Sequence, residues 1–294
     1  MANNDFILNL HKGFNFPIDI LHDYIEQNTN IKISDFVKIT EGYDNEVYDI
    51  GLHMVKIRRE SEVPFSCIKW AVDKCKEQEI KTINIIHCGK ILDTDIMIEE
   101  KIHGKTLTPD LYHEAGAELR KFHNIRVEGF WRRRENGNFD FTEYKDLAQS
   151  NTRDRLKEIP LICEGNIFSS ENIESMKKIL HQYELLESIP VLCHGDYAPK
   201  HILCEKNING IIDFGNFQGG SGYVDLAYFS LNTDKKYFQK FMEGYGKINE
   251  HELLINKIIL LMGYIAHSRK IGDEQDAKKL EIELLHIIKS QVQF

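Results

Sequence analysis

The stretch VLCHGDYAPKHILCEKNINGIIDF, residues Val191–Phe214, places two aspartates and two histidines among short apolar runs. Asp196 follows a His-Gly pair at the end of the first run, and Asp213 ends the last run before Phe-Gly. Short apolar runs bounded by turn residues are typical of buried β-strands. The stretch therefore predicts a hairpin that holds two carboxylates at the ends of neighbouring strands.

Carboxylates in this order suit phosphoryl transfer. One aspartate positions and deprotonates the attacking hydroxyl, and a second holds Mg²⁺ against the phosphates. The kinase signature places a second metal-ligating side chain five residues after the first aspartate, and here that position is His201. We therefore predict Asp196 as the catalytic aspartate, His201 and Asp213 as ligands of Mg²⁺, and His194 as a catalytic-loop residue that orients the loop.

The pattern HGD-xxxx-H-IL…IIDFG resembles the aminoglycoside phosphotransferase family, kinase-like enzymes that include aminoglycoside, choline, homoserine and methylthioribose kinases. Most members carry asparagine where this chain has His201, but the aminoglycoside 2″-phosphotransferases resemble it in placing histidine before Ile-Leu. The resemblance implies an α+β, bilobal protein-kinase-like fold. It implies a small β-rich N-lobe with the hinge over residues 1–102, and a larger, mostly helical C-lobe over residues 103–294 with the hairpin and the acceptor site.

The region before residue 60 favours strands. Short β-like runs lie at Phe36–Ile39, Glu46–Ile50 and His53–Ile57, and a glycine-containing turn around Gly42 separates the first two. In the kinase order such a turn covers the nucleotide phosphates, and the strand that follows carries a lysine that pairs with them. Gly42 and Lys56 are thus the predicted phosphate-binding residues.

The carboxylate partner of this lysine stays open. Kinases supply a glutamate from the next helix, but the helix expected at Cys67–Glu79 offers only Asp73 in its central part, with Glu60 and Glu62 before it. Downstream, the run that ends at Gly104 resembles the hinge of the family. The resemblance implies that the carbonyl of Glu100 and the N–H of Ile102 contact the purine of ATP or GTP.

The rest of the chain favours helices, and amphipathic spacing predicts them at Pro17–Gln27, Pro109–His123, Asp146–Glu158, Ile173–Glu187, Lys235–Tyr245, Glu250–Ser268 and Glu274–Val292. Val127–Asn138 is predicted as a loop, and its basic run Trp131–Arg134 as solvated or closing over phosphate. Asp225 opens another helix. By resemblance it supports the catalytic loop, and a simple cap is the alternative.

Composition indicates a soluble globular protein. The 294 residues are 42% hydrophobic and 28% charged with a net charge of −9, so we expect no nucleic-acid or membrane partner and a cationic ligand instead. Six scattered cysteines predict free buried thiols. No signal segment opens the chain, and the late apolar run Ile258–Ala266 is too short to cross a bilayer, so a cytoplasmic location is expected.

These observations predict Mg²⁺-dependent transfer of the γ-phosphoryl group of ATP or GTP to a hydroxyl of a small molecule, first of all an aminoglycoside, as in antibiotic resistance. The short path from Asp213 to Asp225 leaves no room for the activation loop of a protein kinase. Alternatives are a kinase for choline, homoserine or a sugar, a non-catalytic nucleotide-binding protein of the same fold, and a metal-dependent hydrolase. Whether the protein is a monomer or a dimer stays open.

Overall fold

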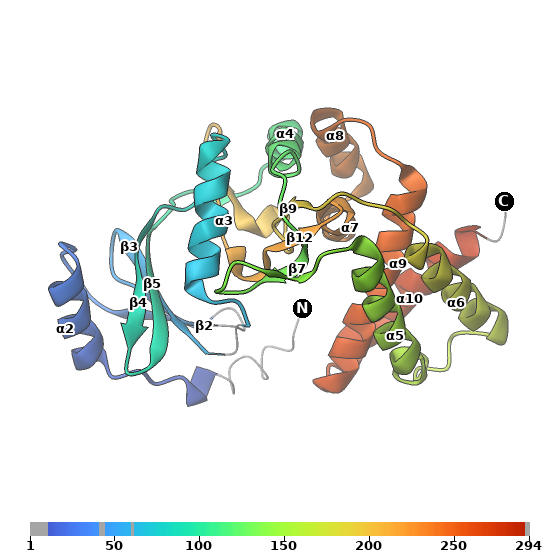
Figure 1. Ribbon diagram of the computed structural model, residues 1–294, viewed down its shortest axis with the longest axis horizontal. Coiled ribbons are helices and arrows are strands. Elements are labelled where there is room, and N and C mark those ends of the chain that lie inside the picture. The colour runs from blue at the N-terminus through green and yellow to red at the C-terminus, as the bar shows by residue number, and fades with distance from the viewer. Residues whose placement is uncertain (1–10, 41–44, 60–61, 292–294) are drawn as a thin grey trace.

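The computed structural model of the protein describes residues 11–40, 45–59 and 62–291. The predicted phosphate-binding Gly42 and the candidate acid Glu60 lie outside these residues. The chain runs from a sheet flanked by α2 (Ile18–Asn28) through a central group of short strands to a bundle of helices (Figure 1).

The first sheet is antiparallel and five-stranded, in the order β1-β2-β3-β5-β4. Its strands are β1 (Val37–Ile39), β2 (Asn45–Asp49), β3 (His53–Arg58), β4 (Ile85–Ile91) and β5 (Thr94–Glu100). Alternation along β5 sends Ile96 and Ile98 into the core cluster that α2 covers. Met97 joins the larger cluster on the other face, and Glu99 shares that face because it lies two residues further on.

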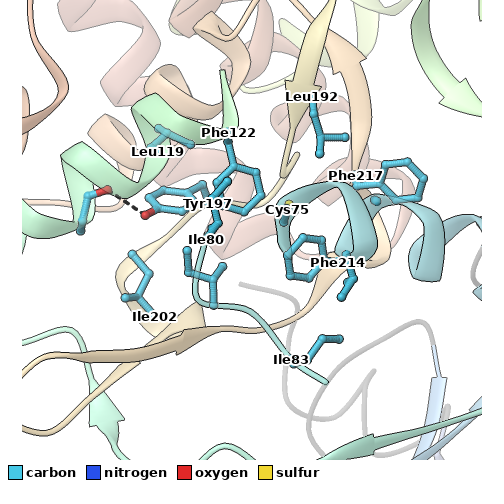
Figure 2. Close-up of a cluster of buried hydrophobic side chains, with 14 of the residues drawn as sticks. Cys75, Ile80, Ile83, Leu119, Phe122, Leu192, Tyr197, Ile202, Phe214 and Phe217 are labelled. Atoms are coloured by element: carbon cyan, nitrogen blue, oxygen red, sulfur yellow. Dashed lines mark hydrogen bonds between the residues drawn. The ribbon is translucent and has the colours of Figure 1, made fainter. Parts of the chain in front are cut away.

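A continuous hydrophobic core joins this sheet to the following part of the chain. Helix α3 (Phe65–Glu77) packs in one cluster with Ile80, Ile83 and Phe214 (Figure 2). A bridge between Thr82 and Ile211 reinforces the contact. Because residues from both predicted lobes fill one core, the boundary between residues 102 and 103 stays a prediction.

The predicted single hairpin is divided between two small sheets. These sheets have the orders β11-β10-β6 and β8-β7-β12-β9. Their strands are β6 (Lys105–Thr106), β7 (Phe130–Arg133), β8 (Phe139–Phe141), β9 (Val191–Cys193), β10 (Ile202–Cys204), β11 (Ile208–Ile211) and β12 (Gln218–Gly220). The hairpin consists of β10 and β11 alone, whereas β9 pairs with β12. The prediction was wrong here because residues 194–201 carry the chain from one sheet to the other.

The loop predicted at Val127–Asn138 is also wrong in part, since it contains β7 and is followed by β8. Trp131 pairs with Gly219 of β12, and Phe130 is 1% exposed. The buried Phe130 thus anchors β7 in the core. The charges of the basic run that follows it do not indicate a strand.

The predicted helices are present, with ends shifted by a few residues. They are α4 (Tyr112–Phe122), α5 (Tyr144–Ile162), α6 (Ser170–Glu184), α8 (Lys235–Tyr245), α9 (Glu250–Lys270) and α10 (Glu274–Gln291), together with α7 (Tyr223–Leu231), which begins two residues before Asp225. Helices α5, α6, α9 and α10 share a core that includes Ile162, Met176, Leu261 and Leu284. Among the described residues, no helix has both the length and the apolar character needed to cross a bilayer.

All six cysteines are free thiols, as predicted. Four are buried, and Cys88 and Cys163 are partly buried.

Candidate active site

Asp196, His201 and Asp213 converge. Asp196 lies in the loop after β9, His201 ends the short turn Pro199–His201, and Asp213 follows β11. The Nε2 atom of His201 lies 3.4 Å from an Asp213 carboxylate oxygen, and its Nδ1 atom lies 3.6 Å from an Asp196 carboxylate oxygen. One ligand atom from each residue lies within 4.8 Å of the others. The structure therefore brings together the three residues predicted for base and metal.

The tautomer of His201 follows from its contacts. Its Nδ1 atom lies 2.8 Å from the backbone carbonyl of Asp196, so Nδ1 carries hydrogen and donates to that oxygen. In the neutral ring, Nε2 then turns a lone pair toward Asp213. A divalent cation between these two acceptors would make the arrangement favourable, and Oδ1 of Asp196 is also buried without a donor among the described residues. This donor set fits a divalent cation, although Mg²⁺ prefers oxygen to imidazole.

Asp213 has a left-handed backbone, with φ 67° and ψ 63°. This conformation costs a residue other than glycine about 1–2 kcal/mol. Burial would raise the pKa of the Asp213 carboxyl, but the positive charge of Lys56 outweighs burial and lowers it. The strained turn thus presents an ionised carboxylate beside the lysine.

Lys56 pairs with Glu99, not with the acids considered from the sequence. Its Nζ atom lies 2.9 Å from Oε1 of Glu99, and both side chains are largely buried. Asp73 instead binds Lys69, and Glu62 is exposed. Burial would lower the pKa of Lys56, but the charges of Glu99 and Asp213 outweigh it and raise the pKa. Sequence spacing missed Glu99 because a carboxylate at the end of an apolar strand resembles an ordinary exit to solvent.

His194 is fully buried and binds backbone on both sides of its ring. Its Nδ1 atom accepts a hydrogen bond from the Asp196 N–H at 3.3 Å, so Nε2 carries the hydrogen and donates to the Ile212 carbonyl at 3.0 Å. Burial lowers the pKa of His194. A neutral His194 therefore joins the loop of Asp196 to the strand before Asp213.

The Asp225 carboxylate binds three donors outside its own helix. Oδ1 accepts from the N–H of Gly195 at 2.7 Å, and Oδ2 accepts from the N–H of His194 at 2.8 Å and from Nε2 of His123 at 3.1 Å. Asp225 is 0% exposed. These contacts hold the backbone of residues 194 and 195 against α7, as expected of a residue that supports the loop of Asp196.

Two tyrosines that the sequence did not indicate lie beside Asp196. Burial and the Asp196 charge raise the pKa of Tyr228, and burial together with Tyr228 and Asp196 raises the pKa of Tyr264. Both phenols therefore stay protonated and can donate. Tyr228 follows Asp225 by three residues on α7, so helical spacing places the two on one face and could have indicated Tyr228 from the sequence. Tyr264 comes from α9, and no sequence spacing relates it to Asp196.

The arginines of β7 have protein partners. Arg132 donates to Oδ1 of Asn216 at 3.0 Å and to the carbonyl of Phe217 at 3.1 Å. The guanidinium of Arg133 lies 4.4 Å from the ring centroid of Trp70 on α3. The basic run thus ties α3 and the segment after Asp213 to β7, and does not form a solvated loop.

The proposed hinge follows β5 directly. The N–H of Glu100 donates to the Asn84 carbonyl and the N–H of Lys101 to the Leu52 carbonyl. In the described part of the chain, the N–H of Ile102 has no backbone acceptor, and the Glu100 carbonyl accepts no bond outside the strand ladder. Neither group predicted to meet a purine is therefore engaged by a turn or loop hydrogen bond within the described residues.

Solved structures share this architecture. A thermostable mutant of the aminoglycoside phosphotransferase APH(4)-Ia, in ternary complex with ADP and hygromycin B, is 14% identical with a TM-score of 0.71, covering 92% of this chain and 97% of that one. The GDP and kanamycin complex of APH(2″)-IIIa is 15% identical with a TM-score of 0.62, covering 94% and 99%. They confirm the predicted α+β, kinase-like fold.

The family follows from the sequence itself. The model of the phosphotransferase enzyme family matches residues 89–254, which is more than half of the chain. The protein belongs to this family, and the predicted enzyme class, a phosphotransferase, is confirmed.

Proposed function

We propose that this protein catalyses Mg²⁺-dependent transfer of the γ-phosphoryl group of ATP or GTP to a hydroxyl of a small molecule, with aminoglycosides as the first acceptor class. The observation that carries the proposal is the convergence of Asp196, His201 and Asp213, with the charge of Lys56 acting on Asp213. A phosphoryl-transfer enzyme needs this combination of base, metal ligands and phosphate-binding cation.

The chain's own groups have distinct roles in this scheme. Lys56 neutralises phosphate oxygens, and Asp196 aligns the acceptor hydroxyl in line with the γ-phosphorus. The acceptor oxygen bonds to phosphorus while the bond from phosphorus to the β–γ bridging oxygen breaks. The hydroxyl proton passes to Asp196, and nucleoside diphosphate leaves. Because the transition state is loose, Asp196 acts mainly by positioning.

Asp213 and His201 would hold Mg²⁺, which supplies neutralisation of the phosphate charge when bound. His194 and Asp225 touch neither substrate in this scheme. They act as positioning residues, since their bonds run to the backbone of the Asp196 loop and to Ile212.

A small acceptor fits the short connection from Asp213 to α7, which holds only a 3₁₀ turn and β12. Aminoglycosides are favoured by the net charge of −9 and by the hygromycin B and kanamycin bound in the similar structures. Glu250 and Glu252, at the start of α9, precede Tyr264 by 12–14 residues, roughly 18–21 Å along the helix. We therefore expect the acidic residues that bind a polycationic acceptor to lie nearer Tyr228 than Glu250 and Glu252 do.

The test compares the wild type with Asp196→Asn and with Asp234→Asn, an exposed aspartate ahead of α8. Each is incubated with Mg²⁺ and ATP or GTP across aminoglycosides, choline, homoserine and simple sugars, and the product is identified by mass. Asp196→Asn should lower kcat about 10²–10⁴-fold while nucleotide Kd stays within about threefold, because Asp196 faces the acceptor. Asp234→Asn should match the wild type.

The outcomes separate the alternatives. Product from choline, homoserine or a sugar alone would replace the aminoglycoside assignment but keep the phosphotransferase. Nucleotide binding without Asp196-dependent product from any acceptor would favour a non-catalytic protein. Hydrolysis of phosphate esters without nucleotide binding would favour a metal-dependent hydrolase, in which Lys56 has no role.

A further inference from the structure

Only one of the two Glu99 carboxylate oxygens takes part in the ion pair with Lys56. Oε1 binds Lys56 at 2.9 Å, and the side chain is 5% exposed. Oε2 is buried and meets no donor among the described residues. Leaving such an oxygen unpaired is unfavourable, because it has lost its hydrogen bonds to water and gained none from the protein. A ligand that donates a hydrogen bond to Oε2 would recover this cost.

The position of Glu99 indicates which part of a ligand would supply that hydrogen. Glu99 comes immediately before Glu100 and three residues before Ile102, whose N–H is unpaired within the described residues. Its side chain lies on the face of the sheet that carries Lys56. A free carboxylate oxygen therefore borders the two backbone groups predicted to bind a purine.

Purines differ at the edge that these groups would meet. Adenine presents a 6-amino group with two hydrogens, whereas guanine presents a 6-oxo group that only accepts. A carboxylate also only accepts. One 6-amino hydrogen can reach the Glu100 carbonyl and the second can reach Glu99, but a 6-oxo group would set oxygen against both.

We propose that Glu99 selects adenine over guanine, so that ATP is the phosphoryl donor. The inference rests on the proposed function, because it assumes that a nucleoside triphosphate lies between the hinge and Lys56. The Glu100 carbonyl is present whatever side chain stands at position 99, so the part of the preference that Glu99 adds can be measured by changing Glu99 alone.

The experiment measures binding by calorimetry, with Mg²⁺ and without acceptor, of the β,γ-imido analogues of ATP, GTP and ITP. The variant is Glu99→Gln. The matched control is Glu118→Gln, because Glu118 is another buried glutamate with Oε1 on a lysine, Lys121, and Oε2 unpaired. It lies on α4, away from the hinge.

In the wild type, the adenine analogue should bind at least about tenfold more tightly than the guanine and inosine analogues. In Glu99→Gln, affinity for all three should fall because Lys56 loses a charged partner, and affinity for the adenine analogue should fall further because its 6-amino group loses the carboxylate acceptor. The ratio between purines should shrink to within about threefold, since a carboxamide both donates and accepts. Glu118→Gln should keep the wild-type ratio.

Equal or tighter binding of the guanine analogue by the wild type would overturn the inference, as would an unchanged ratio in Glu99→Gln. If Glu99→Gln fails to fold, Glu99→Asp replaces it, because the shorter side chain keeps the charge but withdraws the carboxylate from the purine, so the preference for adenine over inosine should again shrink. Failure of the wild type to bind any of the three would instead refute the proposed function.

Discussion

Gly195 lies against Asn216 so closely that a Cβ atom at Gly195 would stand 1.9 Å from the Asn216 carbonyl oxygen. Gly195 immediately precedes Asp196, and Asn216 follows Asp213 by three residues. This contact therefore fixes the spacing between the loops that carry the two aspartates.

Gly195→Ala should abolish most activity and destabilise the protein. Its φ of 79° costs alanine about 1–2 kcal/mol, and the clash adds about 1–3 kcal/mol. Displacing either loop by about 1 Å should lower kcat roughly 10²-fold. Gly272→Ala is the control, because Gly272 has a φ of 76° with nothing within 4 Å. Urea denaturation and kcat for both variants check the prediction, and equal losses would contradict it.

Arg132→Ala should reduce both stability and activity, because it removes two bonds to the segment after Asp213. We expect a loss of about 2–3 kcal/mol, as for hydrogen bonds made by a charged group. Arg134→Ala in the same hairpin should cost less than about 1 kcal/mol, since its partner Asp140 is near the surface and Arg134 is 51% exposed. Thermal denaturation and the Mg²⁺ dependence of turnover measure the difference. An Arg132 variant that behaves like the Arg134 variant would show that β7 does not hold this segment.

The role of His201 as a metal ligand can be tested with different cations. His201→Ala should raise the half-maximal Mg²⁺ concentration by about tenfold or more. His201→Asn offers an oxygen, which Mg²⁺ prefers, so its Mg²⁺ requirement should fall below that of His201→Ala and its Mn²⁺-to-Mg²⁺ rate ratio below that of the wild type. Metal titrations that are identical in all three proteins would remove His201 from the ligand set.

Stability should decrease on acidification because of His194. Its pKa is lowered from 6.5 by burial, so below about pH 6.5 the unfolded chain binds a proton that the folded protein does not. Unfolding free energy therefore falls as pH drops through this range. His87, whose pKa burial also lowers, contributes in the same direction. His194→Gln should make the slope of Tm against pH shallower, whereas exposed His251→Gln should not. A slope unaffected by His194→Gln would argue against a neutral buried ring.

The predictions from sequence were most accurate where spacing along the chain controls geometry. Asp196 and His201 lie in one short loop, so their approach follows from local structure. The partition of β9 and β11 into different sheets was missed because it depends on pairing with β12, which follows Asp213. Amphipathic periodicity was enough for the helices, whose hydrogen bonds are local.

Sequence patterns did not predict the contacts between segments that are distant along the chain. Glu99 reaches Lys56 only because β3 and β5 are neighbours in the sheet, an order that no motif specifies. Tyr264 approaches Asp196 only after α9 packs behind α7. Arg132 was interpreted by its charge, although the buried Phe130 beside it determines that the segment is a strand.

The pairing of Lys56 with a strand residue has a consequence for control of the enzyme. In kinases that take this glutamate from a helix, a swing of the helix breaks the ion pair and switches catalysis off. Here β3 and β5 are joined by a continuous hydrogen-bonded ladder. No rigid-body rearrangement of α3 can separate the two charges. We therefore expect the ion pair between Lys56 and Glu99 to persist whatever the position of α3.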